Sequence, residues 1–110
     1  MVGVYRIVNY VTPDGKDVYR EWHRRLRDTR VKEAADRRLS RMESGNFGDH
    51  KYCGDGIWEL RIDLGPGYRI YYALKGAEIV VLLCAGDKGS QQNDIARAAM
   101  YWNQAKKEFE

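Results

Sequence analysis

The first quarter of the chain holds a short apolar run and then apolar residues at regular spacing. Residues 4–11 are rich in β-branched and aromatic side chains, which is typical of a strand. Pro13-Asp14-Gly15 then predicts a turn. Between about 15 and 27, apolar residues recur at helical spacing, at Val18, Tyr19, Trp22 and Leu26. We therefore expect a strand, a turn and a helix in this order.

A second helix is predicted directly after the first. Asp28 or Thr29 can cap its N-terminus, and Gly45-Asn46 can end it. Its inner face would consist of Val31, Ala34, Ala35, Leu39 and Met42. Residues 15–45 are expected to form a helical hairpin with basic outer faces. Residues 46–56 include three glycines and are expected to be an irregular loop.

Two further segments alternate apolar and polar residues, which predicts two strands of an antiparallel hairpin. The segments are 57–64 and 68–74, with Gly65-Pro66-Gly67 between them as the turn. A three-residue turn would pair Leu64 with Tyr68, and directly opposed residues share a face of the sheet. The resulting core face pairs Ile62 with Ile70, Leu60 with Tyr72, and Trp58 with Leu74.

The opposite face of this hairpin is expected to be exposed and to carry polar side chains. The same register pairs Asp63 with Arg69, Arg61 with Tyr71, and Glu59 with Ala73. It therefore gathers Glu59, Arg61, Arg69 and Tyr71 on one exposed surface of the sheet.

The last third of the chain predicts one buried strand and one helix. Residues 79–84 are continuously apolar, which indicates a central strand covered on both faces. From Ser90 onward the chain is predicted to be helical, with Ser90 as N-cap and Asp94 in the first turn. Its apolar stripe consists of Ile95, Ala98, Ala99, Trp102, Ala105 and Phe109. The predicted order is β-α-α-β-β-β-α, an α+β domain over residues 1–110 with an antiparallel meander and helices on one face.

Charge is unevenly distributed, although the net charge is only +3. Residues 20–43 hold nine Arg or Lys residues against five acids. Basic clustering of this kind indicates a phosphate-bearing or acidic partner. A solvated helix surface with ion pairs is the alternative explanation.

Cysteines, histidines and hydropathy narrow the class of protein. Cys53 and Cys84 are far apart, and Cys84 lies in an apolar run where it is expected to be buried. His23 and His50 lack the spacing of metal ligands, so we expect no metal and no cofactor. No apolar run approaches the roughly 20 residues that span a bilayer, and the N-terminus is too polar for a signal peptide. A cytoplasmic protein without a membrane partner is expected.

Candidate chemistry centres on basic residues near the predicted sheet. Arg61 and Arg69 offer forked donors that suit phosphate oxygens, and Lys88 follows the central strand where a helix begins. Tyr71 can stack on a base or pass a proton, and Lys51 in the loop is a candidate RNA-binding residue. The structural alternative is an Asp63–Arg69 ion pair with Arg61 stacked on Tyr71.

Three motifs in order give the chain a resemblance to a known family. They are Gly56-Ile57-Trp58-Glu59-Leu60-Arg61-Ile62, Gly65-Pro66-Gly67-Tyr68-Arg69-Ile70-Tyr71-Tyr72, and Gly86-Asp87-Lys88 followed by Ser90-Gln91 and Asp94-Ile95. With Gly48-Asp49 before them, they resemble the HigB-like addiction module killer proteins of the RelE/ParE toxin superfamily.

The resemblance implies a RelE-like fold and a toxin of a type II toxin–antitoxin system. Such a toxin cleaves mRNA on the ribosome, inhibits translation, and is neutralised in a hetero-oligomer by a helix-turn-helix antitoxin encoded beside it. Arg61, Arg69 and Lys88 match the basic positions that hold phosphate in RelE-type ribonucleases. Glu59 stands where RelE has a second basic residue, and the catalytic tyrosine of the last helix has no match. Candidates for the general base are Glu59, Tyr71 and His50.

Two other functions stay open within the same superfamily. A ParE-type protein would inhibit DNA gyrase by binding it, with the basic helices and the C-terminal helix as binding surfaces. An antitoxin-binding module without activity would use its basic face only for that partner.

Overall fold

The computed structural model describes residues 4–109, and the side chain of Phe109 lies outside that description. Among the described residues, five strands form one sheet and three α-helices pack on it. The elements are β1 (Arg6–Asn9), α1 (Val18–Arg25), α2 (Thr29–Glu43), β2 (His50–Gly54), β3 (Ile57–Ile62), β4 (Tyr68–Lys75), β5 (Ile79–Asp87) and α3 (Gln91–Ala105), with short 3-10 helices η1 (Lys88–Ser90) and η2 (Lys106–Phe109) around α3. The mixed α+β class that the sequence predicts is confirmed. None of the helices within residues 4–109 is long and apolar enough to cross a membrane.

The sheet is mixed rather than antiparallel throughout. Its strand order is β1-β5-β4-β3-β2, and β1 pairs in parallel with β5 while the other neighbours are antiparallel. β5 is buried along nearly its whole length, as expected for a central strand. The expectation of a purely antiparallel sheet was wrong. The apolar strand β5 pairs with β4 along one edge and with β1 along the other, and the long chain between β1 and β5 allows these two strands to run parallel.

Part of the segment expected to be an irregular loop is the edge strand β2. It pairs with β3 through His50 opposite Leu60, Lys51 opposite Glu59 and Tyr52 opposite Trp58. The register shifts between Tyr52 and Gly54, where the hairpin turns. The glycines that suggested a loop lie near the ends of this strand, so they mark its limits and do not interrupt its pairing with β3.

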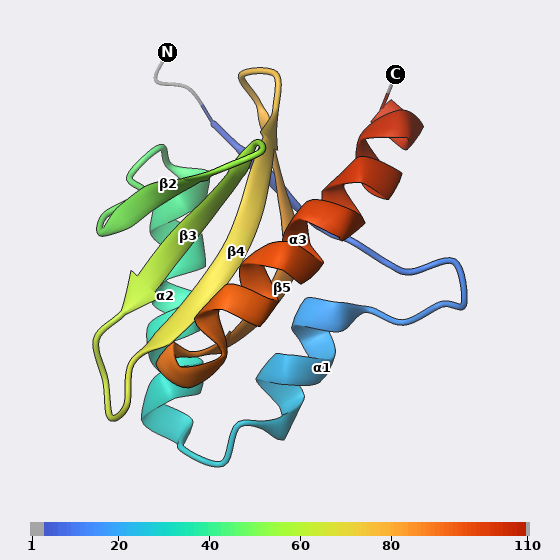
Figure 1. The fold of residues 1–110 in the computed structure, drawn as a ribbon. Helices are drawn as coiled ribbons and strands as arrows, with labels where there is room; N and C mark the ends of the chain where they lie inside the picture. Colours follow the sequence, from blue (N-terminus) through green and yellow to red (C-terminus); the bar gives the residue numbers. More distant parts are fainter. Residues whose placement is uncertain (1–3, 110) are drawn as a thin grey trace.

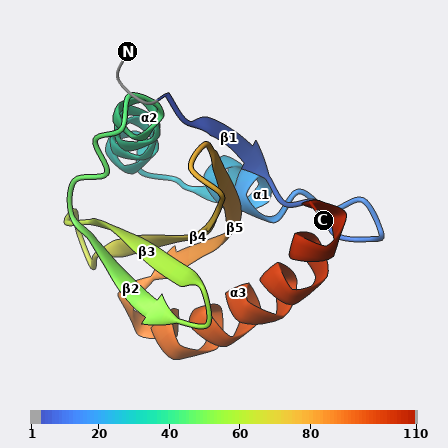
Figure 2. The ribbon, with the colours of Figure 1, turned by 90° about the horizontal axis from the view of Figure 1, so that it is seen from above.

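Helices cover both faces of the sheet, which corrects the expectation that they pack on one face. Figures 1 and 2 show α2 and α3 on opposite sides of the sheet, with α1 near its lower end in Figure 1. The α2-side core includes Ala35, Met42, Leu60, Ile70 and Leu82. The α3-side core includes Ile57, Tyr71, Leu83, Ala98 and Ala105. Residues of α1 join both cores, Tyr19 on the α2 side and Val18 on the α3 side.

The β3–β4 register differs by two positions from the predicted one. Ile62 is opposite Tyr68 and Arg61 is opposite Arg69, so the connection spans residues 63–67. Within it, the Gly67 amide donates to the Leu64 carbonyl at 2.9 Å, so the predicted Gly-Pro-Gly turn forms inside a longer loop. A shift of two positions moves no side chain to the other face. The predicted faces are therefore right although the predicted pairs are wrong.

The predicted N-cap positions are confirmed for both α2 and α3, but only the residue before α2 makes a capping hydrogen bond. The Asp28 carboxylate accepts a hydrogen bond from the Arg30 amide and caps α2. Ser90 occupies the N-cap position of α3, but its hydroxyl makes no capping bond. Instead, Ser90 Oγ donates to Asp94 Oδ2 at 2.5 Å, while the Asp87 carboxylate accepts from the Ser90 amide at 3.2 Å. The first turn of α3 is thereby held against the end of β5.

Candidate active site

A cavity of about 310 Å³ lies where β3 ends, β4 begins and β5 passes into η1. Its walls include Arg61, Arg69 and Lys88, the three cationic residues expected to act together. We call this cavity the cationic pocket. The remaining polar walls are Asp49, Asp63 and Tyr68.

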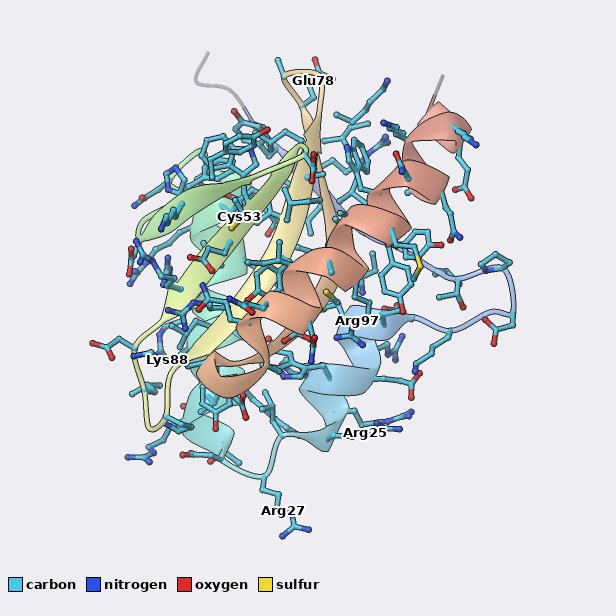
Figure 3. The ribbon with its side chains drawn as sticks, viewed as in Figure 1. Arg25, Arg27, Cys53, Glu78, Lys88 and Arg97 are labelled. Carbon is cyan, nitrogen blue, oxygen red and sulfur yellow. The ribbon has the colours of Figure 1, made fainter. Side chains whose placement is uncertain are left out.

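Backbone pairing explains why the three cations meet. Arg61 and Arg69 are directly opposed across β3 and β4, so their side chains share one face. The Lys88 amide donates to the Gly67 carbonyl at 3.0 Å, which holds η1 beside the β3–β4 connection. Figure 3 shows Lys88 at this end of the sheet, beside the first turn of α3. Lys88 is exposed, and no ion pair holds its ammonium group within the described part of the chain.

Two carboxylates offset the repulsion between the opposed arginines. Arg61 Nε lies 3.2 Å from Asp49 Oδ1, and Arg69 Nε lies 3.1 Å from Glu59 Oε2. Neither contact has the angle of a hydrogen bond, so the attraction in both is mainly that of opposite charges. Like charges directly opposite one another in a sheet are destabilising, and each of these pairs supplies a compensating charge.

Glu59 lies beneath the pocket rather than on an exposed surface. Its exposed fraction is 1%, and Gln91 Nε2 of α3 donates to its Oε2 at 3.1 Å. The Arg69 side chain is itself only 13% exposed. Glu59 does not line the cavity. Its position suits a partner that orients Arg69 rather than a group that touches a ligand.

Tyr71 is fully buried between the sheet and α3, so its expected exposure was wrong. Its hydroxyl makes no hydrogen bond among the described residues. Burial, followed by the nearby carboxylate of Glu59, raises the pKa of Tyr71 well above its ordinary value. The neutral phenol belongs to the α3-side core, because α3 covers the face that alternation alone left open.

The structure does not bring Lys51 and His50 into the cationic pocket. Both lie on β2, and Lys51 is exposed on the face it shares with Glu59. His50 faces the other side of the sheet, opposite Leu60. Its Nδ1 lies 2.8 Å from the Gly48 carbonyl oxygen, and its ring contacts Phe47 and Trp58 at centroid distances of 5.8 and 5.4 Å.

Arg38 of α2 organises one wall of the pocket and was missed in the sequence. Its guanidinium donates to three backbone carbonyls, those of Arg61, Phe47 at 3.2 Å and Asp49 at 2.9 Å. Burial lowers the pKa of Arg38 from its ordinary value. Helical spacing could have found this residue, because it is seven positions after Val31 and four before Met42 on the inner face of α2.

Two other cations, Arg25 of α1 and Arg30 of α2, form ion pairs, as the alternative of a solvated helix surface expects. Arg25 Nη2 lies 3.2 Å from Glu21 Oε1, and Arg30 Nη2 lies 2.9 Å from Asp28 Oδ2. Within residues 4–109, no three His, Cys, Asp or Glu side chains are grouped as a metal site would require.

Fold and pocket together define a small α+β protein with a cationic pocket at one end of a mixed sheet. The chain belongs to the family described as phage-derived Gp49-like proteins (DUF891), whose model matches residues 16–101. That family is associated with toxin–antitoxin modules, which implies an antitoxin partner. The expected association with toxin–antitoxin modules is thus confirmed, while the finer assignment as a RelE/ParE toxin stays a prediction.

A relative from Haemophilus influenzae (strain ATCC 51907 / DSM 11121 / KW20 / Rd) carries the name "Uncharacterized protein". It is 46% identical over 79 residues, which are 72% of this chain and 80% of the relative.

Proposed function

We propose that this protein is the toxin of a type II toxin–antitoxin module and that it cleaves mRNA bound to the ribosome. The observation that carries the proposal is the convergence of Arg61 from β3, Arg69 from β4 and Lys88 from η1 on one pocket. The association of the Gp49-like family with toxin–antitoxin modules supports the toxin class. The RelE-like reaction rests on the sequence resemblance and on the chemistry of the pocket.

In the proposed reaction, the 2′-hydroxyl of one nucleotide attacks the adjacent phosphorus. The bond from O2′ to phosphorus forms and the bond from phosphorus to O5′ breaks, which leaves a 2′,3′-cyclic phosphate and a 5′-hydroxyl. Charge builds up on the non-bridging phosphate oxygens as this happens. Guanidinium and ammonium donors aimed at those oxygens stabilise the transition state more than the ground state.

The ribosome and the antitoxin are the proposed macromolecular partners, and both place the protein in the cytoplasm. The ribosome holds the mRNA in a fixed orientation, which lowers the entropic cost of reaction for a site with few catalytic groups. The antitoxin, a helix-turn-helix protein encoded beside this one, would cover the pocket with acidic or apolar side chains.

The test is primer extension on an mRNA in a translating extract supplied with the purified protein. The wild type should produce new 5′ ends, and Arg61→Ala or Lys88→Ala should reduce their rate of formation by about 10²- to 10³-fold. Arg41→Ala removes the same charge from the exposed outer face of α2 and should cleave like the wild type. If the Lys88→Ala and Arg61→Ala variants leave the same ends at the same rate as wild type, the pocket is not the active site.

A supercoiling assay with purified gyrase separates the main alternative. Inhibition of gyrase by the wild type without any cleavage of mRNA would replace the ribonuclease by a ParE-type inhibitor. If the protein affects neither target and is harmless when expressed without its antitoxin, it is an antitoxin-binding module without activity.

A further inference from the structure

We propose that Asp49 is the general base of the cleavage reaction, and that Arg38 holds it in position. The inference rests on the proposed ribonuclease function and names a catalytic residue that the sequence left open among Glu59, Tyr71 and His50. In the step it serves, the proton of the 2′-hydroxyl passes to the Asp49 carboxylate as O2′ bonds to phosphorus. The departing O5′ takes a proton from water.

A general base must reach the substrate, and this removes the three earlier candidates. Glu59 is 1% exposed, and its Oε2 is occupied by Arg69 and Gln91. The Tyr71 hydroxyl is buried beneath α3. His50 lies on the opposite face of the sheet from Arg61 and Arg69.

Asp49 meets the requirement, because its carboxylate lines the cationic pocket and its side chain is 58% exposed. Oδ1 lies 3.2 Å from Arg61 Nε. Oδ2 accepts no hydrogen bond within residues 4–109, so it is available to accept a proton. The 2′-oxygen and the phosphorus that it attacks belong to the same nucleotide unit. A base beside a phosphate-binding arginine is therefore correctly placed for both.

The backbone around Asp49 is fixed from two sides, which gives the base a defined position. Its carbonyl oxygen accepts from Arg38 Nη2 at 2.9 Å and from the Arg61 amide at 3.0 Å. The preceding Gly48 has φ +62°, and a Cβ there would lie 3.0 Å from Arg38 Nη2. Glycine at this position lets the chain turn tightly against the Arg38 guanidinium.

Asp63 is the competing candidate, because it is the other aspartate that lines the pocket. It is exposed in the β3–β4 connection, and its side chain has no hydrogen bond or ion pair within the described residues. No side-chain contact within residues 4–109 holds its carboxylate relative to Arg61 and Arg69. The two aspartates have the same chemistry, and they differ in how firmly the surrounding structure holds each carboxylate beside the arginines.

The experiment measures single-turnover cleavage of ribosome-bound mRNA by wild type, Asp49→Asn and Asp63→Asn. Affinity for the ribosome is measured in parallel. Loss of the base should slow cleavage by about 10²- to 10⁴-fold in Asp49→Asn, with ribosome affinity within a few-fold of wild type. Asp63→Asn should slow cleavage far less than Asp49→Asn. Equal rates for wild type and Asp49→Asn, or a loss in Asp63→Asn as large as that in Asp49→Asn, would overturn the assignment while the proposed function stands. A wild type that does not cleave overturns both.

Because Asp49 is also the ion-pair partner of Arg61, a displaced guanidinium could slow the reaction instead. Rescue of Asp49→Ala by added carboxylates separates the two causes. If Asp49 transfers the proton, the rescued rate should rise with the basicity of the added carboxylate, from cyanoacetate through formate to acetate. Rescue that is equal for all three, or no rescue of any kind, assigns Asp49 a structural role and overturns the proposal.

Arg38→Lys tests the positioning role. It should lower the rate of the chemical step while ribosome affinity is kept, and the carboxylate series should rescue the Asp49→Ala, Arg38→Lys double variant as well as Asp49→Ala alone. Poorer rescue of the double variant would mean that Arg38 acts through Arg61 rather than through Asp49.

Discussion

Replacement of Glu59 by glutamine is expected to destabilise the protein strongly, because it leaves Arg69 without its charge partner. Glu59 is 1% exposed and the Arg69 side chain 13% exposed, so little water replaces the lost carboxylate. Removing one member of a buried ion pair costs about 3–5 kcal/mol. Arg69 borders an open pocket, and the lower end of that range, about 3 kcal/mol, is expected for Glu59→Gln.

The corresponding fall in Tm follows from the size of the chain. An unfolding entropy of about 2.1 cal/mol/K per residue, over 110 residues, converts each kcal/mol into about 4.3 °C. Glu59→Gln should therefore melt about 13 °C below wild type. Urea unfolding followed by tryptophan fluorescence gives the free energy directly, and the m-value should not change.

Two further variants make the measurement specific. Arg25→Ala breaks the pair of Arg25 with Glu21, whose side chains are 75% and 25% exposed, and should cost less than about 0.5 kcal/mol. The double variant Glu59→Leu, Arg69→Met removes both charges and should be more stable than Glu59→Gln. A loss below about 1 kcal/mol in Glu59→Gln would refute the reasoning, because the pair would then behave as an exposed one.

Backbone fit, thiol burial and phenol burial each have a measurable consequence. Gly86→Ala should cost about 1–3 kcal/mol in urea unfolding, because its Cβ would overlap the Asp94 carboxylate and the Ser90 hydroxyl, and a wild-type midpoint would contradict this. Burial raises the pKa of Cys84 to about 12, whereas Cys53 is partly exposed. A thiol reagent at about pH 8 should therefore label only Cys53 in the native protein but both thiols in denaturant; rapid native labelling of both would contradict this. Burial also strongly raises the pKa of the phenols of Tyr19, Tyr71 and Tyr72. Because the folded state holds these protons more tightly, its stability is intact below about pH 10 and falls as the pH rises further. Phenolate absorbance of these tyrosines should then appear together with unfolding, and ionisation without unfolding would contradict the burial.

The repeat of two residues in β3 and β4 was enough to place Arg61 and Arg69 on the same face. The pairing was wrong by two positions, and the face assignment held because the side-chain period of a strand is also two. The continuously apolar segment 79–84 likewise indicated a strand that is covered on both faces. These properties depend on neighbouring residues and on local geometry, which is why sequence patterns predict them.

Periodicity did not determine which faces of the sheet the helices would cover, or which helix would cover each face. The small residues Ala98 and Ala105 let α3 pack on the face that carries Glu59 and Tyr71. Glu59 and Tyr71 are therefore buried. The same limit applies to Asp49, whose carbonyl oxygen is held by the Arg38 side chain of α2 and by the Arg61 amide of β3.

The sequence by itself determined the strands β1, β3, β4 and β5, the shared face of the two arginines and the basic character of the site. Only the tertiary structure decided which carboxylates face the pocket and which lie beneath it. The physical reason is range: alternation and capping depend on residues close in the chain, whereas coverage by α3 and the contacts of Arg38 join segments that are far apart in it.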